Sequence, residues 1–248
     1  MRTIKDICYS SIPHERHYLD IHLPECEEFK VFVYFHGGGI TDGDKSEYFA
    51  LAEYLTEKNI AVVAANYRLY PSASYPEFIK DAAQAVAWTK QNIENYGKCT
   101  GIYVGGSSAG AYLSMMLCFD SRYLGIHGID PDTLAGFIHD AGQPTCHFNT
   151  LAERGLDPRR IIVDESAPVY HVGTRTTHPP MLFIVSDNDI ECRYEQTMMM
   201  IASLKHFEYD MSKIDLKVMH GGHCEYVHAT DDNNESVFGK IVNDYLNR

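Results

Sequence analysis

The chain repeatedly alternates short apolar runs with longer stretches of helical periodicity. An alternating run at 17–23 is followed by apolar, often β-branched runs at 30–35, 60–65, 100–104, 134–139, 181–185 and 214–219. Helical patterns cover 46–58, 76–95, 109–119, 193–206 and 235–247. A strand followed by a helix and another strand favours a mostly parallel central sheet with helices on both faces. We therefore predict an α/β fold.

The length fits one such unit. The 248 residues are 45% hydrophobic and 22% charged, which is typical of a globular protein, and α/β architectures often reach about 250 residues as one domain. We predict a single domain over 1–248. Residues 140–175 are less regular, and we expect them to form either a small lid-like insertion within it or an ordinary surface excursion.

Charge and cysteine content limit the partners. The formal net charge of −13 argues against DNA or RNA, whose phosphates require a basic face. No run approaches the ~20 apolar residues of a membrane span. The N-terminus lacks the apolar region of a signal peptide, and the seven cysteines are odd in number and form no Cys-x-x-Cys pair. We expect free thiols and a cytoplasmic protein with neither a nucleic-acid nor a membrane partner.

The sequence Gly-Ser-Ser-Ala-Gly at 106–110 matches the pattern Gly-x-Ser-x-Gly. It follows the predicted strand at 100–104 and opens the predicted helix at 109–119. A serine on such a strand-to-helix turn exposes its hydroxyl, and the helix N-terminus favours a developing negative charge. Ser108 is therefore the candidate nucleophile.

A second motif, His-Gly-Gly-Gly at 36–39, directly follows the strand at 30–35. Its glycines leave backbone N–H groups uncovered, as stabilisation of an oxyanion requires. Gly38 and Gly39, with the N–H of Ala109 beside the nucleophile, are the candidate oxyanion hole. The loop lacks the Gly-Lys-Ser/Thr ending of a phosphate-binding loop, and we expect His36 to be structural.

Together with Asn-Tyr-Arg-Leu at 66–69, these motifs resemble those of α/β-hydrolase-fold serine esterases. The chain is most similar to the His-Gly-Gly-Gly carboxylesterases related to hormone-sensitive lipase, and to small acetyl or feruloyl esterases. The resemblance implies an α/β-hydrolase fold and a Ser-Asp-His catalytic triad.

The remaining triad members follow from chain order, which in this fold is Ser, then Asp or Glu, then His. We predict His223 as the base, because the Gly-Gly-His after the strand at 214–219 is similar to the Gly-His of the family. For the acid, the family pattern favours Asp189 over Asp187, with Glu191 as a remote third candidate. A zinc site built on His220, His223 and His228 lacks a strong ligand spacing.

These residues predict a serine hydrolase that cleaves a small carboxylic ester through an acyl-enzyme, with no cofactor and no metal. The alternatives are an amide or formamide hydrolase resembling arylformamidases and, less favoured, a non-catalytic binding protein that has kept the fold.

Overall fold

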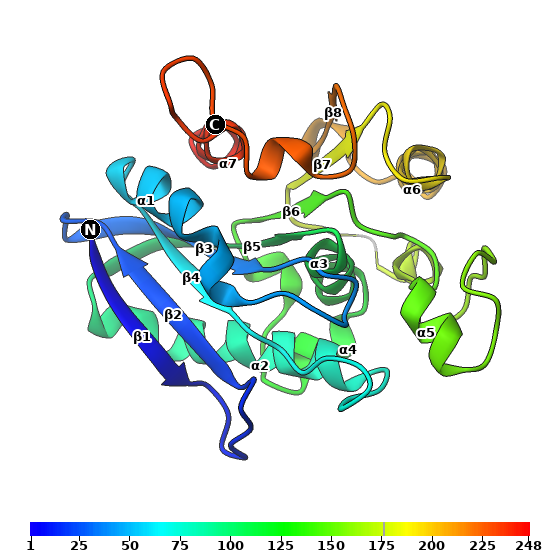
Figure 1. Ribbon diagram of the computed structural model, residues 1–248, viewed down its shortest axis with the longest axis horizontal. Coiled ribbons are helices and arrows are strands. Elements are labelled where there is room, and N and C mark those ends of the chain that lie inside the picture. The colour runs from blue at the N-terminus through cyan, green and yellow to red at the C-terminus, as the bar shows by residue number, and fades with distance from the viewer. Residues whose placement is uncertain (176) are drawn as a thin grey trace.

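A computed structural model describes residues 1–175 and 177–248 (Figure 1). At its centre is an eight-stranded sheet in the order β1-β2-β4-β3-β5-β6-β7-β8. The strands are β1 (Arg2–Cys8), β2 (Tyr18–Leu23), β3 (Glu28–Phe35), β4 (Ile60–Ala65), β5 (Lys98–Ser107), β6 (Gly136–Asp140), β7 (Met181–Ser186) and β8 (Ile214–Met219).

The sheet is parallel from β4 to β8, and β2 pairs antiparallel with both β1 and β4. The helices are α1 (Phe49–Glu57), α2 (Glu77–Asn92), α3 (Ala109–Phe119), α4 (Ser121–Gly125), α5 (Phe148–Glu153), α6 (Arg193–His206) and α7 (Val237–Leu246). The α/β class with a mostly parallel sheet, predicted from the alternation of runs, is confirmed.

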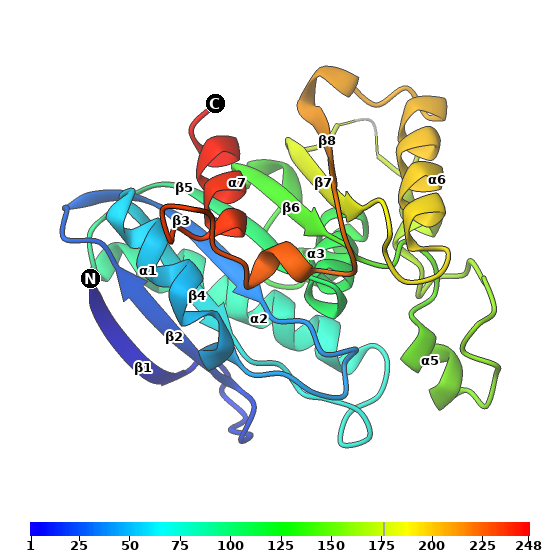
Figure 2. The same ribbon diagram turned by 45° about the horizontal axis from the view of Figure 1, so that its top comes forward.

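Helices cover both faces of the sheet, and β3 shows why its sequence is apolar throughout. Val31, Val33 and Phe35 pack into the core that includes side chains of α2, α3 and α6. Phe32 and Tyr34 point to the other face and pack with α1 and α7, which lie side by side in both views (Figures 1 and 2). A strand that is buried on both faces has no polar side, as expected for the centre of a parallel sheet.

Several elements depart from the sequence prediction. Strand β1 was not predicted. The helix predicted over 76–95 ends at Asn92 and continues as a 3-10 turn, Ile93–Asn95. The helix predicted over 46–58 is a 3-10 turn, Lys45–Tyr48, followed by α1. The segment between β6 and β7 carries α5 and a 3-10 turn, Pro168–His171.

The parallel strands end at a common edge, and Ser107, Asp140, Ser186 and Met219 are the last residues of β5 to β8. In open α/β sheets this carboxyl edge is where ligands bind. Among the described residues, no helix combines the length and the apolar character that crossing a bilayer requires.

Candidate active site

Ser108 sits between β5 and α3 in a sharply turned backbone. Its φ of 55° and ψ of −113° are unusual for a residue with a side chain. Such strain is characteristic of functional turns. Close packing explains the flanking glycines: a Cβ on Gly110 would lie 2.0 Å from the carbonyl oxygen of Phe35, and one on Gly106 would lie 2.5 Å from the same atom. The local sequence thus lets α3 begin directly against β3.

Two further side chains converge on Ser108 from the ends of β7 and β8. The Oγ of Ser108 lies 2.8 Å from Nε2 of His223, and Nδ1 of His223 lies 2.5 Å from Oδ1 of Asp189. This geometry fits a neutral ring whose Nδ1–H donates to the carboxylate while Nε2 accepts from the serine. The structure therefore brings Ser108, His223 and Asp189 together.

The Asp189 carboxylate is held by its surroundings. Its side chain is 0% exposed, and it also accepts hydrogen bonds from the N–H groups of Ser186 and Ile190. Burial alone would raise its pKa, but the hydrogen bond and charge of His223 together with these N–H donors keep the pKa of Asp189 below its usual value. The carboxylate is therefore ionised at neutral pH and favours a protonated imidazole at His223.

The other residues considered for the acid and base lie elsewhere. Asp187 accepts from Nδ1 of His220 at 2.8 Å and from the N–H of Gly221. The His220 side chain is 96% exposed, so this pair faces solvent. Glu191 is exposed, and the ring of His228 lies beside Tyr48. Of the two aspartates that the sequence left open, only Asp189 contacts His223.

The glycine loop after β3 lies against the serine. A Cβ on Gly37 would be 3.4 Å from Cβ of Ser108. Gly38 and Gly39 have φ values of 94° and 63°, and a Cβ on Gly38 would be 2.1 Å from the carbonyl oxygen of Asp42. Within residues 1–175 and 177–248, the N–H groups of Gly38 and Gly39 donate to no protein group. They are available to a bound oxygen.

His36 supports this loop. Its Nδ1–H donates to the carbonyl of Gly37 at 2.8 Å, and its Nε2 accepts from the Arg16 guanidinium at 2.9 Å. Its ring stacks on Tyr67, with centroids 4.4 Å apart. Burial lowers the pKa of His36 to about 4, so the ring is neutral at physiological pH. These contacts agree with the structural role expected for His36.

Arg16 was missed by the sequence analysis. From the loop before β2 it donates to His36 and also to the carbonyls of Gly43, at 2.8 Å, and Tyr67, at 3.2 Å. The Asn-Tyr-Arg-Leu motif supplies a second support, because the Tyr67 hydroxyl donates to the carbonyl of His36 at 2.8 Å. No local pattern marks Arg16, since its partners lie 20 to 51 residues away.

The segment between β6 and β7 borders the same loop. The ring of Phe148 lies 3.0 Å from where a Cβ of Gly39 would stand, and the Asn149 amide donates to the carbonyl of Gly39. Phe148 and Ile190, the residue after Asp189, also line a cleft of about 660 Å³. Most of its other lining residues belong to the segment between β6 and β7 and to the start of α6.

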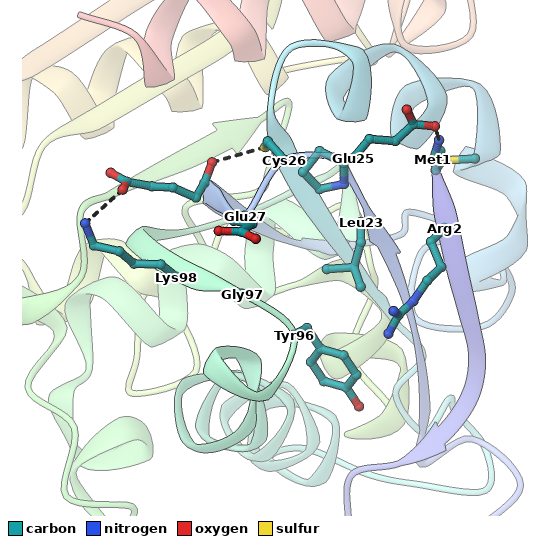
Figure 3. A pocket seen from close by; sticks show the side chains of 11 residues that line it. Met1, Arg2, Leu23, Glu25, Cys26, Glu27, Tyr96, Gly97 and Lys98 are labelled. Atoms are coloured by element: carbon teal, nitrogen blue, oxygen red, sulfur yellow. Dashed lines mark hydrogen bonds and ion pairs between the residues drawn. The ribbon is translucent and has the colours of Figure 1, made fainter.

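Another hollow lies at the amino ends of the parallel strands. It has a volume of about 780 Å³ and lies where β3 and β5 begin, with Leu23, Tyr96 and Lys98 among its lining residues (Figure 3). Lys98 forms an ion pair with Glu28 at 2.8 Å. A dashed line from Lys98 marks it in Figure 3. The side chains that converge on Ser108 are at the other end of the strands, so this hollow is separate from the candidate site.

Cys224, next to His223 in the chain, carries a thiol. Burial raises the pKa of the Cys224 thiol well above its usual value, so this neighbour of His223 is protonated at neutral pH and a poor nucleophile. Within the described parts of the chain, no group of three or more His, Cys, Asp or Glu side chains is arranged to hold a metal ion.

Comparison with known proteins supports the fold and the resemblance to esterases. The model of the BD-FAE family matches residues 19–131. Among the solved structures, esterase B from Lactobacillus rhamnosis superposes with a TM-score of 0.78 at 16% identity, over 99% of this chain and 85% of that one. The chain has the α/β-hydrolase fold. The resemblance to esterases of this fold, predicted from the motifs, is confirmed.

Each of the curated relatives compared here matches less than half of this chain. Esterase LipI of Mycobacterium tuberculosis is 33% identical over 104 residues, which are 41% of this chain and 32% of the relative. Kynurenine formamidase of Danio rerio is 30% identical over 118 residues, 47% of this chain and 39% of the relative. The aligned part covers only 26 to 39% of the length of the first three relatives.

Proposed function

We propose that this α/β-hydrolase is a serine hydrolase that cleaves a small carboxylic ester. The observation that carries the proposal is the pair of contacts made by the His223 ring, 2.8 Å to the Ser108 hydroxyl and 2.5 Å to Asp189. A serine becomes a useful nucleophile when a base accepts its proton and a carboxylate orients that base. The esterases among the similar proteins support the same reaction class.

In the proposed reaction, Oγ of Ser108 bonds to the ester carbonyl carbon while its proton passes to Nε2 of His223. The tetrahedral intermediate then expels the alcohol, which takes that proton. Water, deprotonated by the same ring, next cleaves the acyl-enzyme and releases the acid and free Ser108. Asp189 orients the ring and stabilises its protonated form. No step requires a metal or an organic cofactor.

The N–H groups of Gly38, Gly39 and Ala109 are proposed to hold the oxygen that becomes negative. Three observations support this assignment: the glycine loop approaches Ser108, the first two donors are unoccupied, and Ala109 is the first residue of α3. Preorganised donors of this kind lower the barrier by about 3 kcal/mol each in well-studied hydrolases.

We further infer that residues 140–175 act as a wall of the substrate site rather than as a surface excursion. The inference is supported by the contacts of Phe148 and Asn149 with Gly39 and by the neighbouring cleft. A small ester as the substrate and a cytoplasmic location remain predictions.

The test is a panel of nitrophenyl esters of increasing acyl length, run beside acetylated sugars, on the wild type and Ser108→Ala. The serine variant should lose about 10⁶-fold in kcat while its thermal unfolding is unchanged. A fluorophosphonate probe should label only the wild type, at Ser108. Full activity in Ser108→Ala would refute the assignment, and a folded wild type that is neither labelled nor active would favour a binding protein.

An amide or formamide substrate is the second candidate, because kynurenine formamidase is among the similar proteins. The same groups would serve, with an amine taking the proton in place of an alcohol. Comparison of kcat/KM for matched aryl esters and formanilides separates the two, and a ratio in favour of the formanilide would reassign the substrate class.

A further inference from the structure

A second carboxylate lies beneath the candidate site, and the proposed reaction does not use it. Asp140 ends β6 and is 0% exposed. Its Oδ2 accepts from the hydroxyl of Ser107 and its Oδ1 from the hydroxyl of Tyr226. The Tyr34 hydroxyl donates in turn to Oγ of Ser107 at 2.8 Å. Three buried hydroxyl groups therefore form one network around this carboxylate.

The network joins the two halves of the site. Ser107 directly precedes Ser108, and the N–H of Ser108 donates to the backbone carbonyl of Asp140 at 2.7 Å. Tyr226 stands three residues after His223, on the 3-10 turn Glu225–Val227 that follows the base. The Asp140 carboxylate thus contacts both the turn that carries the nucleophile and the segment that carries the imidazole.

The charge of Asp140 lacks a permanent counterion. In residues 1–175 and 177–248, no Lys, Arg or His side chain lies within ion-pair distance of it. A buried carboxylate without a cationic partner is costly to maintain, even when it is hydrogen-bonded. The groups whose charges act on it are His223, which attracts it when protonated, and Asp189, which repels it. Its neighbours Tyr34, Tyr226 and Cys224 are neutral at physiological pH because burial raises the pKa of each.

We propose that Asp140 is a positioning residue, whose buried carboxylate holds the His223 segment against the Ser108 turn and whose negative charge favours the protonated imidazole. The proposal rests on the proposed function, since it assumes that His223 gains a proton during acyl transfer. Asp140 touches no reacting atom and acts through the ring and the two hydroxyl groups.

The charge is sensitive to pH in the range where a histidine base titrates. Burial raises the pKa of Asp140 to about 6, and the hydrogen bonds from Ser107 and Tyr226 partly oppose that rise. Protonation of Asp140 therefore accompanies the acid loss of activity that a histidine base produces. The acid limb of the wild type should then reflect both groups, His223 and Asp140.

The experiment compares the wild type with Asp140→Asn, using nitrophenyl acetate across the pH range in which both fold. The amide keeps the shape and loses the charge, so the imidazole should become a weaker base. We expect kcat to fall about tenfold, KM to stay within about threefold, and the midpoint of the acid limb in kcat/KM to move down by about one pH unit. An acid limb with an unchanged midpoint would overturn the proposal, because a purely structural role does not alter the basicity of His223.

Two further variants keep the proposal testable if Asp140→Asn fails to fold. Tyr226→Phe and Ser107→Ala each remove one donor while Asp140 remains. Each should lower kcat, and the double variant should lose less than the sum of the two losses in barrier, because both act on one carboxylate. Additive losses would contradict a shared network. The matched control is Tyr209→Phe, a buried tyrosine just before β8 at the opposite edge of the sheet, whose activity should equal that of the wild type.

Failure of the proposal for Asp140 can be distinguished from failure of the proposed function. If the wild type hydrolyses esters and Ser108→Ala does not, but Asp140→Asn keeps the activity and pH profile of the wild type, the inference about Asp140 alone is wrong. If the wild type shows neither hydrolysis nor probe labelling, the proposed function is wrong and the inference falls with it.

Discussion

Two aspartates stand two positions apart after β7, and their surroundings differ sharply. The Asp189 side chain is fully buried against His223, whereas Asp187 is 44% exposed and pairs with an exposed histidine. A buried carboxylate beside an imidazole orients the ring and stabilises its charge, but an exposed pair is screened by water and contributes little. Only the first arrangement can support a base.

We therefore expect Asp189→Asn to lower kcat by a factor on the order of 10⁴, because the ring loses both its orientation and its counter-charge. Asp187→Asn is the matched control and should stay within about threefold of the wild type, since its partner His220 is 96% exposed and the pair faces solvent. Steady-state kinetics on one nitrophenyl ester measures kcat for both variants and shows which aspartate is the acid. Equal losses in both variants, or a larger loss in Asp187→Asn, would show that the acid is misassigned.

The sequence predicted that the catalytic acid lies in the loop after this strand, but the motif left Asp187 and Asp189 as alternatives. Their side-chain directions depend on the turn, in which the N–H groups of Ser186 and Ile190 donate to Asp189 and that of Gly221 donates to Asp187. Gly221 lies 34 residues further along the chain. Contacts of such long range cannot be read from local pattern. Arg16 was missed for the same reason.

At the scale of elements, the prediction succeeded where strands are buried on both faces and failed at the edge of the sheet. Strand β4 is buried at every position, so its apolar run marks it clearly. Strand β1 reads Arg-Thr-Ile-Lys-Asp-Ile-Cys and none of its residues is fully buried. An edge strand with charges does not show the period-two pattern that identifies a strand, and charges there protect against edge-to-edge pairing.

The turn between β5 and α3 depends on the contact of that helix with β3. A Cβ on Gly110 would meet the backbone of Phe35 and His36, at 2.0 and 2.7 Å from their carbonyl oxygens, and backbone cannot move aside as a flexible side chain can. We expect Gly110→Ala to lower the free energy of unfolding by about 3 kcal/mol and to reduce activity, because α3 and Ser108 must shift.

Gly125→Ala is the control for that substitution. Gly125 ends the short helix α4, and a Cβ there would meet nothing within 4 Å. Alanine at this helical position should be neutral or stabilise by up to about 1 kcal/mol. Chemical denaturation of both variants provides the comparison, and equal stabilities would mean that the helix is not tightly packed on β3.

The hydrogen bonds by which Arg16 supports the glycine loop have a role that can be measured. Arg16→Met removes three donors to His36, Gly43 and Tyr67 while keeping an unbranched side chain of comparable length. The loop should then hold its N–H groups less firmly, and kcat should fall about tenfold, consistent with the loss of charge-assisted hydrogen bonds. Arg122→Met, which removes an ion pair with Asp120 on a side chain that is 64% exposed, should leave kcat unchanged. The prediction is wrong if both variants behave alike.

At the scale of the whole molecule, the candidate site is formed by residues from 16 to 226 at the carboxyl ends of the parallel strands. It includes the buried charge of Asp140. Asp140, the last residue of β6, contacts β5 and the segment after β8, which are distant in sequence but adjacent in space. Folding must transfer this carboxylate out of water, and Ser107 and Tyr226 only partly compensate. The same charge that we propose to favour the protonated base therefore weakens the fold.

The sign of its pH dependence follows from the direction of the shift. The pKa of Asp140 rises on folding from 3.8 to about 6, so the native state holds a proton that the unfolded chain has already released between these values. Stability is therefore lost as pH rises through this window, and the full cost applies above it. At about 1.4 kcal/mol for each pH unit, the cost reaches roughly 3 kcal/mol at neutral pH.

Asp140→Asn removes this cost at every pH. Its free energy of unfolding, relative to that of the wild type, should increase between pH 4 and pH 6.5 by up to about 3 kcal/mol and then stay constant. Urea denaturation at a series of pH values measures the difference directly. A difference that does not change with pH would mean that Asp140 is not buried as a charge, and the coupling between a costly carboxylate and a more basic His223 would lose its physical basis.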